Sequence, residues 1–269
     1  MMTKYKNRVL VSFGGYCPMK CKHCYTYEIE ERRKEDSVGQ LVEGISDKEF
    51  DVIYVSQSYE NFFDEGKGIE LCRGLFERYK KDILIITRSR LSDAALDALA
   101  HLCAEMKESG NRLYLAVSCF ADESYGISEN VELCATPEER LENLRRAYER
   151  GIHTILLLRP IFPSAIVPVR ECMNLILRAK GYVDAVVSSG LIVTERILER
   201  LQLQGKELAY DEDGDSDYLK DLPKENVHFL DVEEELKQLE VLCGAEKVAF
   251  FRHSMPALNY IAGGQISEN

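Results

Sequence analysis

The sequence lacks any long apolar run. No stretch approaches the ~20 consecutive apolar residues that a membrane-spanning helix needs. It also lacks a positively charged start followed by an apolar segment, which is the pattern of a secretion signal. We therefore expect no membrane partner, and we predict a cytoplasmic protein.

Excess positive charge is missing as well. The 269 residues include 46 acidic and 34 basic side chains, which gives a formal net charge of −12 at pH 7. Such a chain is not attracted as a whole to nucleic acid or anionic lipid, although a local basic patch is compatible with this charge. The composition therefore argues against a function that depends on binding nucleic acid. Its length and its 45% apolar content fit one large α/β domain, alone or with an appendage.

A disulfide framework is absent too. Nine cysteines occur, but six of them are scattered singly along the chain. Disulfide scaffolds belong to short secreted chains that are dense in cysteine, so this spacing indicates a reducing compartment. We expect five of them to pack in the core rather than to hold a further metal cluster: Cys72, Cys103, Cys134, Cys172 and Cys243.

The remaining three cysteines lie close together. Residues 17–24, which we call the cysteine loop, read Cys-Pro-Met-Lys-Cys-Lys-His-Cys and follow a short apolar run. A short loop can turn Cys17, Cys21 and Cys24 toward one metal centre. Three ligands leave a position open for chemistry, whereas a structural zinc site needs four. A zinc site completed by His23 or by a distant residue is the alternative, although no second Cys-x-x-Cys pair is present.

Apolar strands alternate with helical patterns over most of the chain. We predict strands at 7–13, 51–56, 82–87, 112–118, 152–159 and 182–187, and helices at 68–81, 92–110, 136–151 and 168–181. This order is typical of a parallel sheet built from right-handed crossovers. Six units are too few for a closed eight-stranded barrel, so we predict an α/β fold with an open, partial (β/α)6 barrel.

The alternation ends at Gly190. Beyond it we expect a helix over 191–203, a charged helix over 231–242 and a last strand at 248–252. We interpret residues 1–190 as the barrel core and residues 191–269 as a C-terminal cap that packs on it.

This cysteine spacing, placed after the first strand of a six-fold β/α chain, resembles the radical S-adenosylmethionine (SAM) superfamily. The resemblance covers roughly residues 7–190, and the pattern is closest to relatives of spore photoproduct lyase. It implies a [4Fe-4S] cluster held by Cys17, Cys21 and Cys24, with SAM bound at the fourth iron. It further implies reductive cleavage of SAM to a 5′-deoxyadenosyl radical, which takes hydrogen from a substrate. An electron donor such as flavodoxin or ferredoxin is implied as a partner.

The resemblance also implies which residues meet SAM. His23 stands where the family often has an aromatic residue, and Tyr25 follows the third cysteine. The Gly-Gly-Glu type segment after the second strand is replaced here by Ser56-Gln57-Ser58-Tyr59-Glu60, so Ser56, Gln57 and Ser58 are candidates for SAM contacts. Ser118 and Arg159 end later strands, where SAM lies in parallel α/β folds. The polar residues Thr87, Arg88 and Ser89 end the third strand in the same way.

Cys119 follows Ser118 at the same expected edge. A cysteine donates hydrogen to a product radical in photoproduct lyases, and by resemblance we predict this role for Cys119. The sequence does not identify the substrate, and three classes are open: a small molecule, a peptide or nucleic acid. Three functions are therefore open: a radical SAM enzyme, a lesion-repair lyase acting on nucleic acid, and a zinc-binding protein without catalysis.

Overall fold

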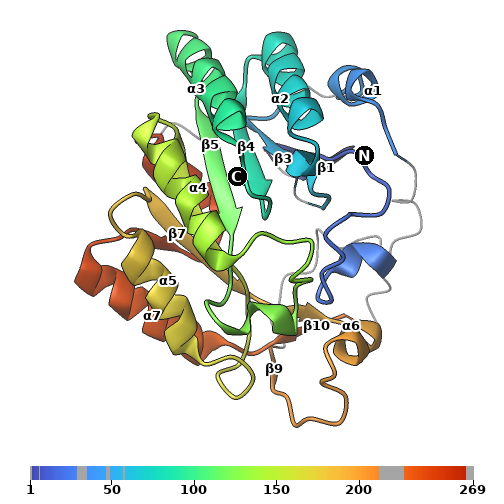
Figure 1. Cartoon of the computed structure of the whole chain (residues 1–269), viewed down its shortest axis with the longest axis vertical. Coiled ribbons are helices and arrows are strands. Elements are labelled where there is room, and N and C mark those ends of the chain that lie inside the picture. Colours follow the sequence, from blue (N-terminus) through green and yellow to red (C-terminus); the bar gives the residue numbers. More distant parts are fainter. Residues whose placement is uncertain are drawn as a thin grey trace.

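The computed structural model describes residues 2–5, 7–28, 35–46, 49–56, 58–211 and 227–264. One eight-stranded sheet runs through it in the order β1-β2-β3-β4-β5-β6-β7-β11 (Figure 1). Its strands are β1 (Met2–Tyr5), β2 (Arg8–Val11), β3 (Val52–Val55), β4 (Asp82–Thr87), β5 (Leu113–Ser118), β6 (His153–Ile161), β7 (Ala185–Gly190) and β11 (Phe250–Phe251). Strand β1 is antiparallel to β2, and all other neighbours are parallel.

The sheet is open. Its edge strands β1 and β11 do not pair with each other in the described part of the chain, so the strands form no closed barrel. The prediction of an α/β fold with a partial barrel is confirmed. The predicted last strand is also present, because Phe250 pairs with Val186 of β7. Strand β11 therefore adds a seventh parallel strand to the six that the sequence pattern indicates.

Helices cover both faces of the sheet. One face packs against α1 (Val38–Glu43), α2 (Glu65–Tyr79), α3 (Asp93–Glu108), α4 (Pro137–Glu149), α5 (Val169–Ala179) and α7 (Glu233–Glu246). Ile53 and Val55 point to this face, whereas Tyr54 and Leu84 share the opposite core with α8 (Ser254–Ile261). Because both faces are buried, the strands are continuous apolar runs. No helix among the described residues is long and apolar enough to cross a membrane.

Local signals in the sequence set the helix ends. Ser92 caps α3 by accepting a hydrogen bond from the backbone N–H of Ala95. Thr136 and Glu139 form a capping box at the start of α4, where proline occupies the first turn. Gly110 follows α3 with a φ of 79°, a left-handed conformation that glycine adopts without strain.

The segment after Gly190 differs from the expectation of one helix over 191–203. It begins with β8 (Ile192–Val193), and only then does α6 (Glu195–Arg200) follow. The β-branched pair favours a strand, and the Thr194 side chain caps the helix that comes after it. Strand β8 forms a small sheet with β10 (His228–Leu230) and β9 (Tyr210–Asp211). Single-turn 3-10 helices lie at η1 (Tyr25–Glu28), η3 (Asn61–Phe63) and η4 (Ser124–Ile127).

Helix α4 carries a buried ion pair. Its arginines alternate with glutamates, a pattern that predicts a surface laced with salt bridges. This is right for Arg145, which pairs with Glu142 of its own helix, but wrong for Arg140, which is fully buried and pairs with buried Glu129. Arg140 lies three residues after Pro137 and four before Leu144, on the helix face that packs on the sheet, and this position explains its burial.

Replacing Arg140 with methionine should destabilise the protein. The change leaves the Glu129 carboxylate buried with one cation fewer, and breaking a buried pair in this way costs about 3 kcal/mol or more. Unfolding by urea, followed by circular dichroism, measures the loss. Arg145→Met on the exposed side of α4 is the matched control and should change stability little. Equal losses in the two variants would contradict the structural role of the buried pair.

Candidate active site

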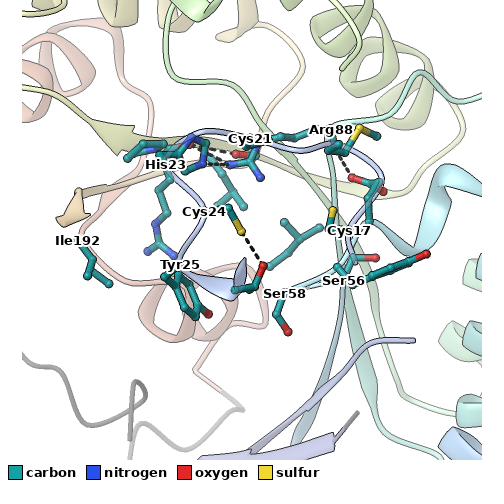
Figure 2. Close-up of a pocket in the computed structure, with 18 of the residues that line it drawn as sticks. Cys17, Cys21, His23, Cys24, Tyr25, Ser56, Ser58, Arg88 and Ile192 are labelled. Atoms are coloured by element: carbon teal, nitrogen blue, oxygen red, sulfur yellow. Dashed lines mark hydrogen bonds between the residues drawn. The ribbon is translucent and has the colours of Figure 1, made fainter. Parts of the chain in front are cut away.

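A cavity lies at the carboxyl ends of the parallel strands, where the cysteine loop meets them (Figure 2). Eleven residues that the sequence marks as candidates line this one cavity: Cys17, Cys21, His23, Cys24, Tyr25, Ser56, Ser58, Thr87, Arg88, Ser118 and Arg159. Parallel α/β folds bind ligands at this edge. Another candidate, Gln57, lies outside the described residues.

The cysteine loop is held by contacts from residues outside it. The backbone N–H of Lys22 donates to the carbonyl of Ser128 at 2.7 Å. The Tyr27 hydroxyl donates to the Cys17 carbonyl at 3.0 Å, and Arg200 of α6 donates to the Cys24 carbonyl at 2.9 Å. These bonds go to backbone atoms of the loop and leave the cysteine sulfurs to other partners.

The three thiols are free and lie in an apolar setting. Burial raises the pKa of Cys17 to about 12 and also raises the pKa of Cys24. The Cys21 sulfur shares a hydrogen bond with the Cys134 sulfur, in which either thiol can be the donor. Thiols in such surroundings ionise together only when a metal supplies positive charge, as iron does.

The donor set fits an iron–sulfur cluster in its chemistry. Thiolates are the usual ligands of such clusters, and three of them line one cavity here. In the described part of the chain, no three side chains of Cys, His, Asp or Glu converge as ligands of a single ion. Ligands of a four-iron cluster bind separate irons and need no such convergence.

His23 is a neutral side chain in this site. Burial, reinforced by the neighbouring Arg88 guanidinium, lowers its pKa to about 3. Arg88 Nη2 lies 3.5 Å from His23 Nε2, and His23 Nδ1 lies 2.9 Å from the Ser128 hydroxyl. A guanidinium can only donate, so Nε2 accepts and Nδ1 carries the proton toward Ser128. His23 thereby connects the cysteine loop to the segment before α4.

Arg88 is fixed by a buried carboxylate. Its Nε donates to Glu129 at 3.1 Å, and Glu129 also accepts from Arg140. Burial by itself raises the pKa of Glu129, but the two guanidinium groups outweigh it and hold the pKa below its usual range. Glu129 is therefore ionised at neutral pH, and Arg88 is held at the cavity wall beside His23 (Figure 2).

The segment after β3 replaces glycines by polar side chains. Ser56 adopts a φ of 75°, a left-handed conformation that is uncommon for residues other than glycine and that often marks functional sites. Glu60 lines the cavity and accepts hydrogen bonds from the Thr87 hydroxyl at 2.8 Å and from the backbone N–H of Arg88 at 2.7 Å. Burial raises the Glu60 pKa, and these donors oppose that effect.

The last two strand-end candidates are in contact. The Ser118 hydroxyl donates to the Arg159 carbonyl at 3.2 Å, which joins the ends of β5 and β6. Arg159 Nη2 donates to the Arg252 carbonyl at 3.2 Å, so the C-terminal segment also reaches this wall.

Cys119 is placed differently from the other candidates. It is fully buried, and its thiol faces the Ala121 carbonyl at 3.7 Å. Among the described residues that line the cavity, Cys119 does not occur. Burial raises its pKa to about 12. The hydrogen-donor role of Cys119 stays a prediction.

Three residues that contact the cysteine loop or Arg88 were not predicted as part of the site from the sequence: Ser128, Glu129 and Cys134. They belong to the connection between β5 and α4, which shows no helical or strand periodicity. Cys134 in particular is no ordinary core cysteine, because its sulfur lies 3.9 Å from the sulfur of Cys21. No sequence signal marks this pairing across 113 residues.

Solved structures share this fold. Spore photoproduct lyase complexed with dinucleoside spore photoproduct matches with a TM-score of 0.61 and 13% identity, over 90% of this chain and 75% of the lyase chain. The protein anSMEcpe with bound AdoMet (SAM) and the Cp18Cys peptide matches with a TM-score of 0.53 and 12% identity, over 90% of this chain and 62% of its own. No curated protein sequence matches the chain.

The sequence itself carries the family pattern. The family model of the radical SAM superfamily matches residues 11–176, a region that begins in β2, contains the cysteine loop and ends in α5. Members of this superfamily are enzymes that use SAM. The match spans more than half of the chain, and with the cavity described above it shows that this protein belongs to the radical SAM superfamily.

Proposed function

We propose that Cys17, Cys21 and Cys24 hold a [4Fe-4S] cluster and that SAM binds beside it in the cavity of Figure 2. The observation that carries this proposal is the convergence of the three thiols and the polar strand ends on one cavity. When bound, the cluster and SAM together supply a 5′-deoxyadenosyl radical that removes hydrogen from a substrate.

The residues of the chain have separate tasks in this proposal. Arg159 offers a cation to the SAM carboxylate, and the hydroxyl groups of Ser56, Ser58 and Ser118 offer hydrogen bonds to its polar groups. Tyr25 lines the cavity with Ile192 and offers a flat apolar surface to adenine (Figure 2). Glu60 already accepts protein donors, so its task is to hold the wall in place.

The catalytic core of the proposal spans residues 1–190, and residues 191–269 are an extension that packs on it. Strand β11 joins the sheet and α8 covers its inner face, which supports this arrangement. A one-electron donor such as flavodoxin or ferredoxin would reduce the cluster in a reducing cytoplasm. The proposal does not choose between a small molecule, a peptide and nucleic acid as the substrate.

Replacing Cys21 with alanine should abolish cluster assembly while the fold is retained. Anaerobic reconstitution followed by iron and sulfide analysis, together with the charge-transfer absorbance of the cluster, measures assembly. Cys103→Ala, at a half-buried thiol of α3, is the matched control and should assemble the cluster as the unaltered protein does. Tight zinc binding by the unaltered protein, with no cluster and no SAM cleavage, would instead support the zinc-binding alternative.

Replacing Arg159 with glutamine should weaken SAM binding by about tenfold or more, because a charge-assisted hydrogen bond to a carboxylate is lost. Calorimetric titration of SAM into the reconstituted protein measures the affinity. Arg90→Gln removes an exposed arginine outside the cavity and should leave the affinity unchanged. Unchanged affinity in Arg159→Gln would remove this residue from the proposed SAM site.

Lesion repair on nucleic acid is a second candidate. The fold similarity to spore photoproduct lyase bound to a dinucleoside favours it, and the net charge of −12 opposes it. This candidate predicts binding of single-stranded or duplex DNA at low salt, with an affinity that falls steeply as salt rises. Fluorescence anisotropy across a salt series measures it, and no binding at low salt would eliminate the repair function.

A further inference from the structure

A fourth cysteine lies behind the cysteine loop. The Cys134 sulfur is 3.9 Å from the Cys21 sulfur, and both side chains are buried together with Met19. Cys134 does not occur among the described residues that line the SAM cavity. It lines a separate surface hollow with Met19 and Ser89. Cys134 therefore approaches Cys21 from the side away from the proposed SAM position.

The position of Cys134 is fixed by its backbone neighbours. Its N–H donates to the Asn130 carbonyl at 2.9 Å, and the next residue, Ala135, donates to the Arg88 carbonyl at 3.2 Å. Buried Arg140 donates to the Ala135 carbonyl at 2.8 Å. Two residues that also bind Glu129 thus hold the Cys134 segment in place, and its thiol stays close to Cys21.

We propose that Cys134 is a positioning residue whose S–H donates a hydrogen bond to the Cys21 sulfur and thereby raises the reduction potential of the cluster. This inference rests on the proposed function. A ligating Cys21 is a thiolate without a proton, so within this pair only Cys134 can donate. Hydrogen bonds to cluster sulfurs stabilise the reduced form, which carries the additional negative charge.

The place of Cys134 separates this role from that of a fourth ligand. A ligand of the remaining iron has to face the cavity in which SAM is proposed to bind. Cys134 instead contacts the sulfur of a residue that the proposal already assigns as a ligand. The Cys134 thiol has two acceptors within 3.9 Å, the Met19 carbonyl and the Cys21 sulfur. The proposal places its proton on the Cys21 side once Cys21 is a ligating thiolate.

The test compares Cys134→Ala and Cys134→Ser with the unaltered protein after anaerobic reconstitution. Redox titration monitored by electron paramagnetic resonance gives the reduction potential without relying on turnover. We expect all three proteins to assemble the cluster, with a lower potential for Cys134→Ala. Cys134→Ser keeps a donor and should restore a potential at or above that of the unaltered protein. Cys243→Ala, at a fully buried thiol of α7, is the matched control and should leave the potential unchanged.

Two results would overturn the inference. Equal potentials in the alanine variant, the serine variant and the unaltered protein would show that Cys134 donates no effective hydrogen bond. Loss of the cluster from both Cys134 variants would show that Cys134 is a ligand or is needed for folding, and circular dichroism would separate these two causes. Failure of the unaltered protein to assemble any cluster would contradict the proposed function itself, which is a distinct outcome.

Discussion

The pairing of one buried carboxylate with two guanidinium groups underlies the arrangement of the site. Glu129 has no exposed side-chain surface and is ionised, so the fold has to supply cations to it. Arg140 comes from a helix packed on the sheet, and Arg88 comes from the end of β4. The buried Glu129 carboxylate thus fixes the position of Arg88. Arg88 in turn orients His23 in the cysteine loop and adds to the effect of burial, which keeps His23 neutral.

Much of the fold was predictable because local and periodic signals agree with it. Strands such as β4 are apolar runs long enough to be recognised, and α4 begins with proline inside a capping box. Strand β1 was not predictable, because the polar sequence Met-Thr-Lys-Tyr becomes a strand only by pairing with β2. The start of α6 was missed for a related reason, since two β-branched residues, Ile192 and Val193, are too short a signal for a strand without the pairing to β10.

Some residues of the candidate site could also be predicted from the sequence, and others could not. Residues that follow a strand end, such as Ser118 and Arg159, could be placed at one edge because parallel strands share that edge. Residues of the connection before α4 could not be placed. Glu129 and Cys134 join the site through contacts with Arg88 and Cys21, which lie far away in the sequence. The left-handed backbone conformation of Ser56 could not be predicted either, because a serine in the sequence does not indicate a positive φ.

The residues that hold the cysteine loop follow it in the sequence, and this order bears on when the loop can adopt its conformation during synthesis. The cysteine loop is synthesised before Ser128, Cys134 and Arg200, the residues that hold it. Its described conformation is therefore complete only after residue 200 has been added and α6 has formed. Iron and sulfide that arrived earlier would meet three thiols on an unsupported segment, so the order of synthesis favours insertion of the proposed cluster into an already folded chain.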